Sequence, residues 1–315
     1  MENKAIHYDT VKENNKRVIR NLVRKCEVCT KRELEEYSGL SFPTVGSALK
    51  ELVETGEILT RQGDSKGGRP GAVFLLNAEY ISVLRMIIQE YELSIQVLDY
   101  GGKVIANFRK TITEEVNQQQ LVEIVKEVKN EYKNITIAVM GIPGVACRGV
   151  IEHIPYLPQL EKTNIVTPFM EKLGICLFLE NDINMIAMGE LSLQSDFAHI
   201  LWEDGCIGSA IVLDGRLLRG SHGAAGEVEL FCTNQEDRNH CLLQAVFGIT
   251  AVVDVPLIAI SGKEITRQDI EELKEKINEK LANYKRPEIV LVAEHETLYE
   301  KGLWQVALEY CRQMK

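Results

Sequence analysis

Three residues near the N-terminus, Thr44, Ser47 and Lys50, have side chains that suit contact with DNA. Their spacing places them toward one side of a helix. Ser41 is a good N-cap for that helix, and Pro43 fits its first turn, where a missing N–H costs little. Small hydroxyl groups and a lysine can approach base edges and phosphates. The sequence therefore predicts a recognition helix that exposes these three residues.

A second group with this chemistry, Arg61, Lys66 and Arg69, lies in a glycine-rich stretch between two apolar runs. The runs, residues 58–60 and 72–76, are typical of two strands joined by a basic loop. Glycines let the backbone and the guanidinium groups come close to a phosphate ridge or a minor groove. The pattern indicates the wing of a DNA-binding module.

Three helices in succession must position these residues. The first is expected from about residue 12 to residue 25, where apolar residues recur at helical spacing,. The second begins at a capping box of Thr30 and Glu33 and breaks at Gly39. The third ends at Gly56, a natural C′ residue. With the wing, this order predicts a winged helix-turn-helix over residues 1–76; a generic three-helix bundle with a surface hairpin is the alternative.

Two carboxylates further along the chain have two interpretations each. Asp182 precedes a helical pattern at 184–194 and suits an N-cap, but at the end of a strand it equally suits a cleft,. Glu227 is either a solvated carboxylate or, because small residues and glycines precede it, a group packed near a pocket.

The composition of the chain excludes some classes of protein. The chain has 315 residues and a net charge of −10, which argues against nonspecific coating of nucleic acid,. Residues 1–75 carry 13 Lys and Arg against 11 Asp and Glu, so a mildly basic head precedes an acidic body,. No long apolar window and no secretory leader is recognisable, so we expect no membrane association and a cytoplasmic location.

The eight cysteines are scattered, and free thiols are the default in a chain of this kind,. Cys26 and Cys29 form a C-x-x-C pair with no second pair at zinc-finger spacing, so we expect buried thiols. One further set has the chemistry of metal ligands, although we expect no metal there: His222, Cys232, His240 and Cys241,.

The rest of the chain alternates strand and helix patterns, which predicts an α/β body over about residues 80–315. The clearest strands are at 93–99, 104–106, 134–140, 175–179, 199–202, 207–212 and 287–292. Helical patterns lie at 118–132 and 184–194 and after Asn239 and Ile265.

Several short motifs follow one another in this body and resemble the ROK family of repressors, open reading frames and sugar kinases. Their order and spacing carry the resemblance, which runs from about residue 12 to 295. The motifs are Gly68-Arg69-Pro70, Gly141-Ile142-Pro143-Gly144, Glu180-Asn181-Asp182-Ile183-Asn184, Gly205-Cys206-Ile207-Gly208, the stretch 214–227 and Pro287-Glu288-Ile289-Val290. The resemblance implies an actin-like ATPase fold with two α/β lobes around a cleft.

The resemblance also implies roles for individual residues. In family members that phosphorylate sugars, the aspartate that Asp182 matches is the general base for the sugar hydroxyl. Asn181 would bind other hydroxyls, and Glu227 matches a second sugar-contacting carboxylate. Together with Gly144, these residues are the effector site that the resemblance implies.

Three departures from the family pattern bear on catalysis. Ile87 and Gln89 stand near the aspartate and the glycine of the first phosphate motif. Leu230 replaces a histidine that serves sugar and zinc, the zinc loop is absent, and no glycine pair for adenosine follows Val290. Phosphoryl transfer depends on positioning and charge neutralisation, so we expect no catalysis, no cofactor and no metal.

The sequence thus predicts a transcriptional repressor that binds a palindromic operator in double-stranded DNA as a homodimer, since a single helix-turn-helix buries too little surface. A sugar or sugar phosphate bound between the lobes would change the geometry of the dimer. Two rivals stay open. One is a ligand-independent regulator whose body only dimerises or binds a protein partner, and the other is an active sugar kinase.

Overall fold

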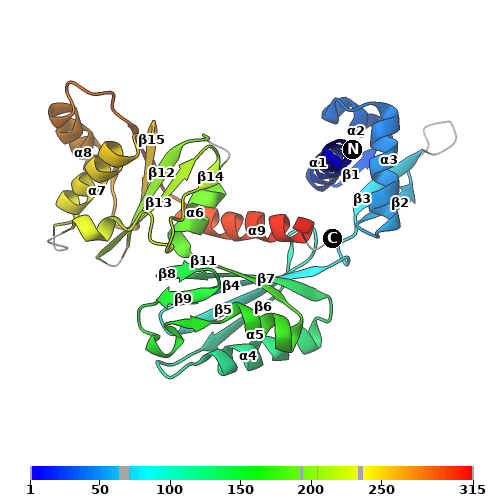
Figure 1. Cartoon of the computed structure of the whole chain (residues 1–315), viewed down its shortest axis with the longest axis horizontal. Helices are drawn as coiled ribbons and strands as arrows, with labels where there is room; N and C mark the ends of the chain where they lie inside the picture. Colours follow the sequence, from blue (N-terminus) through cyan, green and yellow to red (C-terminus); the bar gives the residue numbers. More distant parts are fainter. Residues whose placement is uncertain (1, 64–70, 192–193, 204, 233–236, 314–315) are drawn as a thin grey trace. The chain divides into compact units, whose positions relative to one another are not determined.

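The computed structural model describes residues 2–63, 71–191, 194–203, 205–232 and 237–313. Contacts divide the chain into two compact units (Figure 1). The first contains Met1–Val83 and Val97–Ala106, and the second contains Leu84–Gln96 and Asn107–Lys315. In the described residues, no helix is long and apolar enough to cross a membrane.

The first unit begins with three helices, α1 (Glu2–Cys26), α2 (Lys31–Ser38) and α3 (Phe42–Glu54). The predicted capping box at Thr30 is present, because the Thr30 hydroxyl accepts from the Glu33 amide and the Glu33 carboxylate accepts from the Thr30 amide. Ser41 caps α3 as predicted. Gly39 and Gly56 have φ of 66° and 81°, the left-handed conformation that ends helices at glycine,.

A three-stranded sheet completes this fold. Strands β2 (Ile58–Gln62) and β3 (Ala72–Leu76) pair antiparallel as the wing pattern predicted. Strand β1 (Val28–Thr30), which no sequence pattern predicted, pairs with β3 and gives the order β1-β3-β2. The core contains Ile19, Leu34 and Leu49, all buried. This first unit is therefore a winged helix-turn-helix.

The second unit contains two α/β lobes, as predicted. The sheet of the first lobe has the order β11-β7-β4-β5-β6, and α4 (Gln118–Glu131) and α5 (Val166–Leu173) cover one of its faces (Figure 1). Its strands are β4 (Ser82–Gln89), β5 (Glu92–Leu98), β6 (Val104–Thr111), β7 (Ile135–Ile142) and β11 (Cys176–Asn181). A smaller sheet beside it consists of β8 (Val145–Cys147), β9 (Val150–His153) and β10 (Thr163–Asn164).

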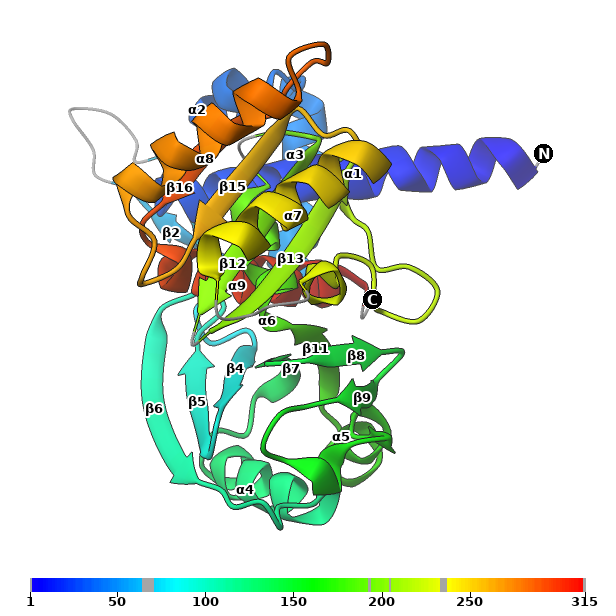
Figure 2. The same ribbon diagram turned by 90° about the vertical axis from the view of Figure 1, so that its left-hand side faces the viewer.

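The second lobe has a sheet of the order β14-β13-β12-β15-β16. Helices α7 (Arg238–Val252) and α8 (Arg267–Lys280) cover one face, and α6 (Asp182–Glu190) and α9 (His295–Gln313) lie on the other (Figures 1 and 2). The strands are β12 (Phe197–Glu203), β13 (Cys206–Leu213), β14 (Arg216–Leu217), β15 (Leu257–Ser261) and β16 (Glu288–Val292).

Two glycines let α6 and α9 pack closely. A Cβ on Gly189 would lie 2.1 Å from the carbonyl oxygen of Leu298, and one on Gly302 would lie 1.7 Å from that of Met185. The helix expected at 184–194 was placed too late in the sequence, because α6 begins at Asp182 and ends at Glu190. This close packing fixes α6, whose first residues belong to the candidate site.

Candidate functional site

The three polar residues of the predicted recognition helix differ in how exposed they are and in whether their side chains are already paired. Ser47 and Lys50 are exposed, and Lys50 makes only a loose pair with Glu54 at 3.8 Å. The hydroxyl of Thr44 lies 2.8 Å from that of Ser41, so it already takes part in the helix cap. Of the three residues predicted to contact DNA, Ser47 and Lys50 therefore have the more available side chains.

A hollow of about 350 Å³ lies between α1 and α3, beside these residues. Thr44 and Ser47 line it on one side, and Lys12 and Lys16 of α1 line it on the other. Both lysines pair with Glu51, at 2.7 and 3.4 Å. These two cations were not predicted from the sequence, because nothing in α1 itself indicates that it faces α3.

The wing is described only in part. Arg61 lies in β2 and is exposed, so it belongs to a strand rather than to the loop that the sequence predicted. Lys66 and Arg69 lie outside the described residues. The thiols of the C-x-x-C pair fit the expectation of a structural role, since Cys29 is buried in the core and burial raises its pKa to about 12.

A buried polar cluster inside the first unit joins three distant segments. Glu57, 1% exposed, accepts from the Arg20 guanidinium of α1 at 2.6 Å and from the Tyr100 hydroxyl at 3.0 Å. Arg24 lies over the Tyr100 ring at 5.3 Å, and the ring also packs edge-on against Tyr80. Tyr100 lies in the turn between β5 and β6, so the cluster ties that turn to the DNA-binding fold.

In the second unit, Asn181 lies at the end of β11 and connects two parts of the first lobe. Its side-chain amide donates to the carbonyl oxygen of Gly144, and its oxygen accepts from the Asn184 amide at 3.2 Å. Gly144 has φ of 126°, and a Cβ there would lie 2.4 Å from the carbonyl oxygen of His153. The structure therefore brings together Asn181 and Gly144, two of the four predicted effector residues.

Glu180, next to Asn181, holds a network that the sequence did not indicate. It is 3% exposed and accepts from the Arg219 guanidinium at 2.6 Å and from the Asn184 side chain at 2.9 Å. Arg219 follows β14 in the second lobe. This half-buried ion pair fixes the end of β11, which carries Asn181 and leads directly into Asp182.

The sequence allowed two interpretations of Asp182, and the structure shows that one of them is wrong: Asp182 is not the N-cap of α6. Asn181 caps the helix, and Asp182 is the first helical residue. The Asp182 carboxylate accepts only from the adjacent Ile183 amide, at 2.7 Å, in the part of the chain that the structure describes. Burial, together with the nearby Glu203 and Glu227, raises the pKa of Asp182 to about 7. The carboxyl group thus keeps hydrogen-bonding capacity beyond the Ile183 amide and holds its proton far more tightly than an exposed aspartate,.

Tyr299 of α9 lies close to this carboxyl group. Burial, and to a lesser degree the charge of Asp182, raise the pKa of the Tyr299 phenol well above its usual value. A Cβ on Gly141 would lie 1.9 Å from the Tyr299 oxygen, so the phenol occupies the space that this glycine leaves. Among the described residues, its buried hydroxyl has no hydrogen-bond partner. No sequence signal identified Tyr299, because it comes from a helix 117 residues away.

Glu227 is half-buried beside the smaller sheet of the first lobe. A Cβ on Gly223 would lie 2.6 Å from the carbonyl oxygen of Ala146, so the glycine-rich approach packs closely, as predicted. Burial and the charge of Glu229 raise the pKa of Glu227, whereas His153 acts to lower it. The charge of Glu227 contributes to the raised pKa of Asp182, so the two carboxyl groups lie within electrostatic reach of each other.

The turn that matches the first phosphate motif is occupied by side chains. Glu90 takes φ of 47°, a conformation that favours glycine,. Tyr91 packs edge-on against Tyr156 with ring centroids 6.0 Å apart, and its hydroxyl donates to Glu114 at 3.2 Å. A carboxylate and a phenol therefore stand in the turn that matches the first phosphate motif.

The second lobe shows a similar change near its nucleotide motifs. Glu203, at the end of β12, pairs with Lys263 at 3.0 Å and lies 3.9 Å from His295, the first residue of α9. Burial lowers the pKa of His295, although the charges of Glu203 and Glu296 act to raise it. An acidic side chain thus stands beside the β12–β13 turn that matches a phosphate-binding turn, where it would repel an anion.

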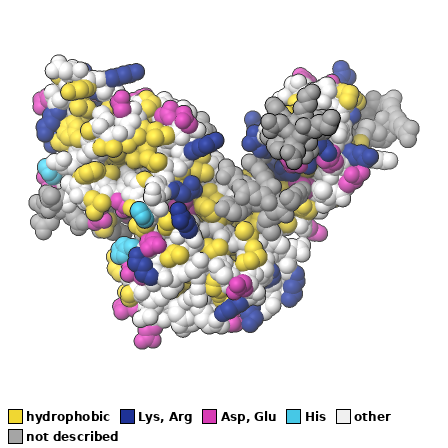
Figure 3. All heavy atoms as spheres, viewed as in Figure 1, with side chains coloured by type: hydrophobic (Ala, Val, Ile, Leu, Met, Phe, Trp, Pro, Cys, Tyr) yellow, Lys and Arg dark blue, Asp and Glu magenta, His cyan; other side chains and the backbone are white. Residues whose placement is uncertain are grey.

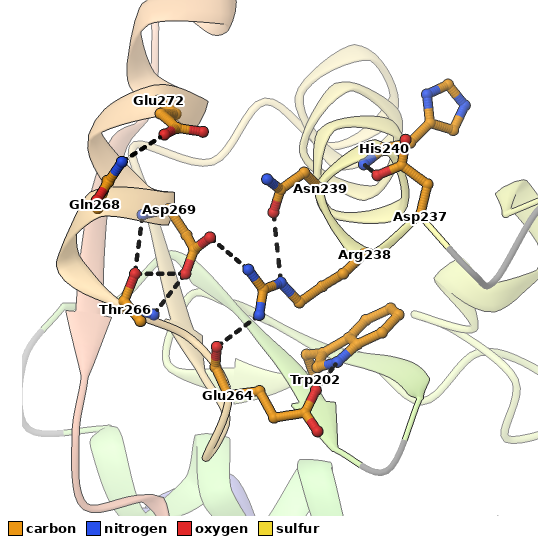
Figure 4. Close-up of polar contacts among 10 residues, drawn as sticks. All are labelled: Trp202, Asp237, Arg238, Asn239, His240, Glu264, Thr266, Gln268, Asp269 and Glu272. Atoms are coloured by element: carbon orange, nitrogen blue, oxygen red, sulfur yellow. Dashed lines mark hydrogen bonds and ion pairs between the residues drawn. The ribbon is translucent and has the colours of Figure 1, made fainter.

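Arg238 connects the first turns of α7 and α8 (Figure 4). It donates to the Glu264 carbonyl oxygen at 2.6 Å and pairs with Asp269, which caps α8 together with Thr266. His240 points away from this cluster (Figure 4). The described residues include no group of three or more side chains placed to hold a metal. Burial and Cys241 raise the pKa of Cys232 to about 12, which favours the thiol over a metal-binding thiolate,.

Comparisons with known proteins agree with these features. The sequence profile of the ROK family matches residues 91–241. The chain is 17% identical to the crystal structure of a ROK family transcriptional regulator, a homologue of the Escherichia coli MLC protein, with a TM-score of 0.66 over 95% of this chain and 99% of that one. A ROK hexokinase from Thermus thermophilus aligns with a TM-score of 0.57, 19% identity, and coverage of 74% of this chain and 100% of that one.

These matches agree with the resemblance to the ROK family, and the α/β body has the fold of the solved ROK proteins. The xylose repressor of Caldicellulosiruptor bescii is 23% identical over 247 residues, which are 73% of this chain and 61% of that protein. The xylose repressor of Bacillus subtilis is 22% identical over 241 residues, 69% of this chain and 60% of that protein. The chain thus spans about 60% of the length of these curated relatives.

Proposed function

We propose that this protein is a DNA-binding transcriptional repressor that a sugar or sugar phosphate controls. The observation that carries the proposal is the pairing, in one chain, of a winged helix-turn-helix with a ROK-type body. The exposed Ser47 and Lys50 of α3 would enter the major groove, and Arg61 and the lysines beside α3 would contact phosphates,. Two copies would bind the halves of a palindromic operator.

The effector site would consist of Gly144, Asn181, Asp182 and Glu227, with Tyr299 added. Sugars offer many hydroxyl groups, and Asp182 and Tyr299 have hydrogen-bonding capacity to spare among the described residues,. The xylose repressors among its relatives make an aldopentose the first sugar to test. Glu203 and the crowded turn at Tyr91 argue against the transfer of phosphate to that sugar,.

A ligand at this site can change DNA binding only if the two states of the protein bind it with different affinity. The Glu57 cluster supplies a physical connection. Tyr100 lies in the turn between β5 and β6, and both strands belong to the five-stranded sheet of the first lobe. A shift of this sheet would therefore move residues that pack directly on α1 of the DNA-binding fold.

DNA binding is tested by footprinting the purified protein on the DNA upstream of its own gene. We expect a protected site with two similar halves, and we expect Lys50→Glu to abolish protection. Lys274→Glu, on the exposed face of α8, is the matched control and should protect normally. Equal protection by both variants would show that α3 is not the recognition helix. No protected site for the wild type would contradict the repressor function itself.

A further inference from the structure

The second lobe has a hollow of about 660 Å³ that the proposed repressor function does not use. It lies between the last turns of α7 and α8 and the chain that follows α8. Phe247 and Ala251 of α7 line it on one side, and Leu281 and Tyr284 line it on the other. Figure 3 shows apolar side chains gathered on the part of the molecule that holds these helices. This volume is in the range that small-molecule sites occupy.

The charged groups of the hollow are mainly cationic. Lys280 and Lys285 line it, and among the described residues Asp254 is the one acidic residue that does so. The Lys280 ammonium lies 5.3 Å from the centre of the Phe247 ring, so a positive charge stands directly over the apolar wall,. Within the described residues, neither lysine makes an ion pair with a carboxylate. A molecule with an apolar body and an anionic head would match both features.

A third observation concerns Thr250, which also lines the hollow. Its hydroxyl oxygen is buried and has no hydrogen-bond partner among the described residues. A buried polar group without a partner is costly, and such groups are rare in folded proteins. A polar atom of a bound ligand would satisfy it.

We propose that this hollow binds a small amphipathic anion, with its apolar body against Phe247, Ala251 and Leu281 and its carboxylate or phosphate head at Lys280 and Lys285. The site lies in the second lobe, apart from the residues of the proposed effector site. It does not depend on DNA binding, so each proposal can fail while the other stands.

Calorimetric titration of the full chain with decanoate, decyl phosphate, decanol and decyltrimethylammonium tests this assignment. We expect one molecule of either anion to bind, and the neutral and cationic compounds to bind at least about tenfold more weakly. A preference between the two anions identifies the natural head group. Equal binding of all four compounds, or binding of none, would overturn the proposal.

Variants locate the binding. Ala251→Trp should fill the hollow and remove binding of the anions, and Lys280→Gln with Lys285→Gln should weaken it about tenfold. Lys274→Gln, which removes a charge from α8 outside the hollow, should bind like the wild type. Unchanged binding by Ala251→Trp would refute the site. If no anion binds and Ala251→Trp changes the oligomeric state in light scattering, the face is an interface between copies of the chain.

Discussion

Two regions of the α/β body present opposite chemistry: the sugar side, which is the proposed effector site, and the phosphate side, which consists of the turns that match the family's phosphate motifs. On the sugar side, Glu180, Asn181 and Asn184 form a closed set of hydrogen bonds that holds Asp182 in place. On the phosphate side, Glu90 and Tyr91 occupy the first turn, and Glu203 stands beside the second. The first set can bind hydroxyl groups, whereas the second set presents negative charge and bulk to an anion.

The difference follows from what each task needs. Binding a sugar needs a few donors and acceptors in fixed positions, which a buried network supplies. Phosphoryl transfer needs groups that neutralise the charge that develops on the phosphate, and each acidic substitution works against this. A body that only senses a sugar can lose the second set and keep the first.

The largest expected effect concerns the network on the sugar side. Glu180→Ala removes the acceptor of Arg219 and of the buried Asn184, so we expect a loss of about 2–4 kcal/mol in the free energy of unfolding. Urea unfolding measures it. Glu127→Ala, which removes an exposed pair with Lys110, should leave the unfolding midpoint unchanged. Similar midpoints for the two variants would show that the network does not support the site.

The next effect concerns pH. The folded pKa of Asp182, about 7, lies above its unfolded value of 3.8, so the folded state holds the proton more tightly. The contribution of this group to stability is complete below about pH 4, falls as pH rises toward 7, and stays low above that. Asp182→Asn should remove this dependence and raise the free energy of unfolding above pH 7. Parallel pH profiles of wild type and variant would contradict the assignment.

A smaller effect tests whether the sugar side communicates with DNA. Tyr100→Phe removes one hydrogen bond to Glu57, which keeps Arg20, so we expect a loss of about 1 kcal/mol in the free energy of unfolding,. DNA affinity without sugar should stay unchanged, and the release of DNA by sugar should weaken. Tyr37→Phe, an exposed tyrosine of α2, is the control. Full release by the Tyr100 variant would exclude this route.

The smallest effect concerns the phosphate side. Glu90→Gly relieves the left-handed conformation and should stabilise the protein by about 0.5 kcal/mol,. It should not restore nucleotide binding, because Tyr91 and Glu203 remain. Thermal unfolding with and without MgATP measures both expectations, and Glu92→Gly, within β5, should destabilise instead,. A stabilisation by MgATP in the Glu90 variant would show that one residue blocks the nucleotide.

The sequence predicted what local patterns encode. The capping box at Thr30, the cap at Ser41 and the end of α3 at Gly56 depend on neighbouring residues, and the structure has all three. Strand β1 was missed because its three residues are too few to show a period of two,. Tyr299 and Tyr100 were missed because their roles depend on contacts with residues far away in the chain. Asp182 was predicted to be either a cap or a cleft residue, and the cap interpretation was wrong because the adjacent Asn181, also a good cap, takes that position,.

The most direct test of the account is the titration of sugars into the complex of the protein with its own upstream DNA, without nucleotide, followed by fluorescence anisotropy. A panel of aldoses that includes xylose, together with their phosphates, covers the proposed effectors. The account predicts that one compound releases the DNA from the wild type and that Asp182→Ala binds the DNA normally but responds far less. Specific DNA binding that no compound changes would contradict the sensing function of the body, as would an undiminished response of the variant.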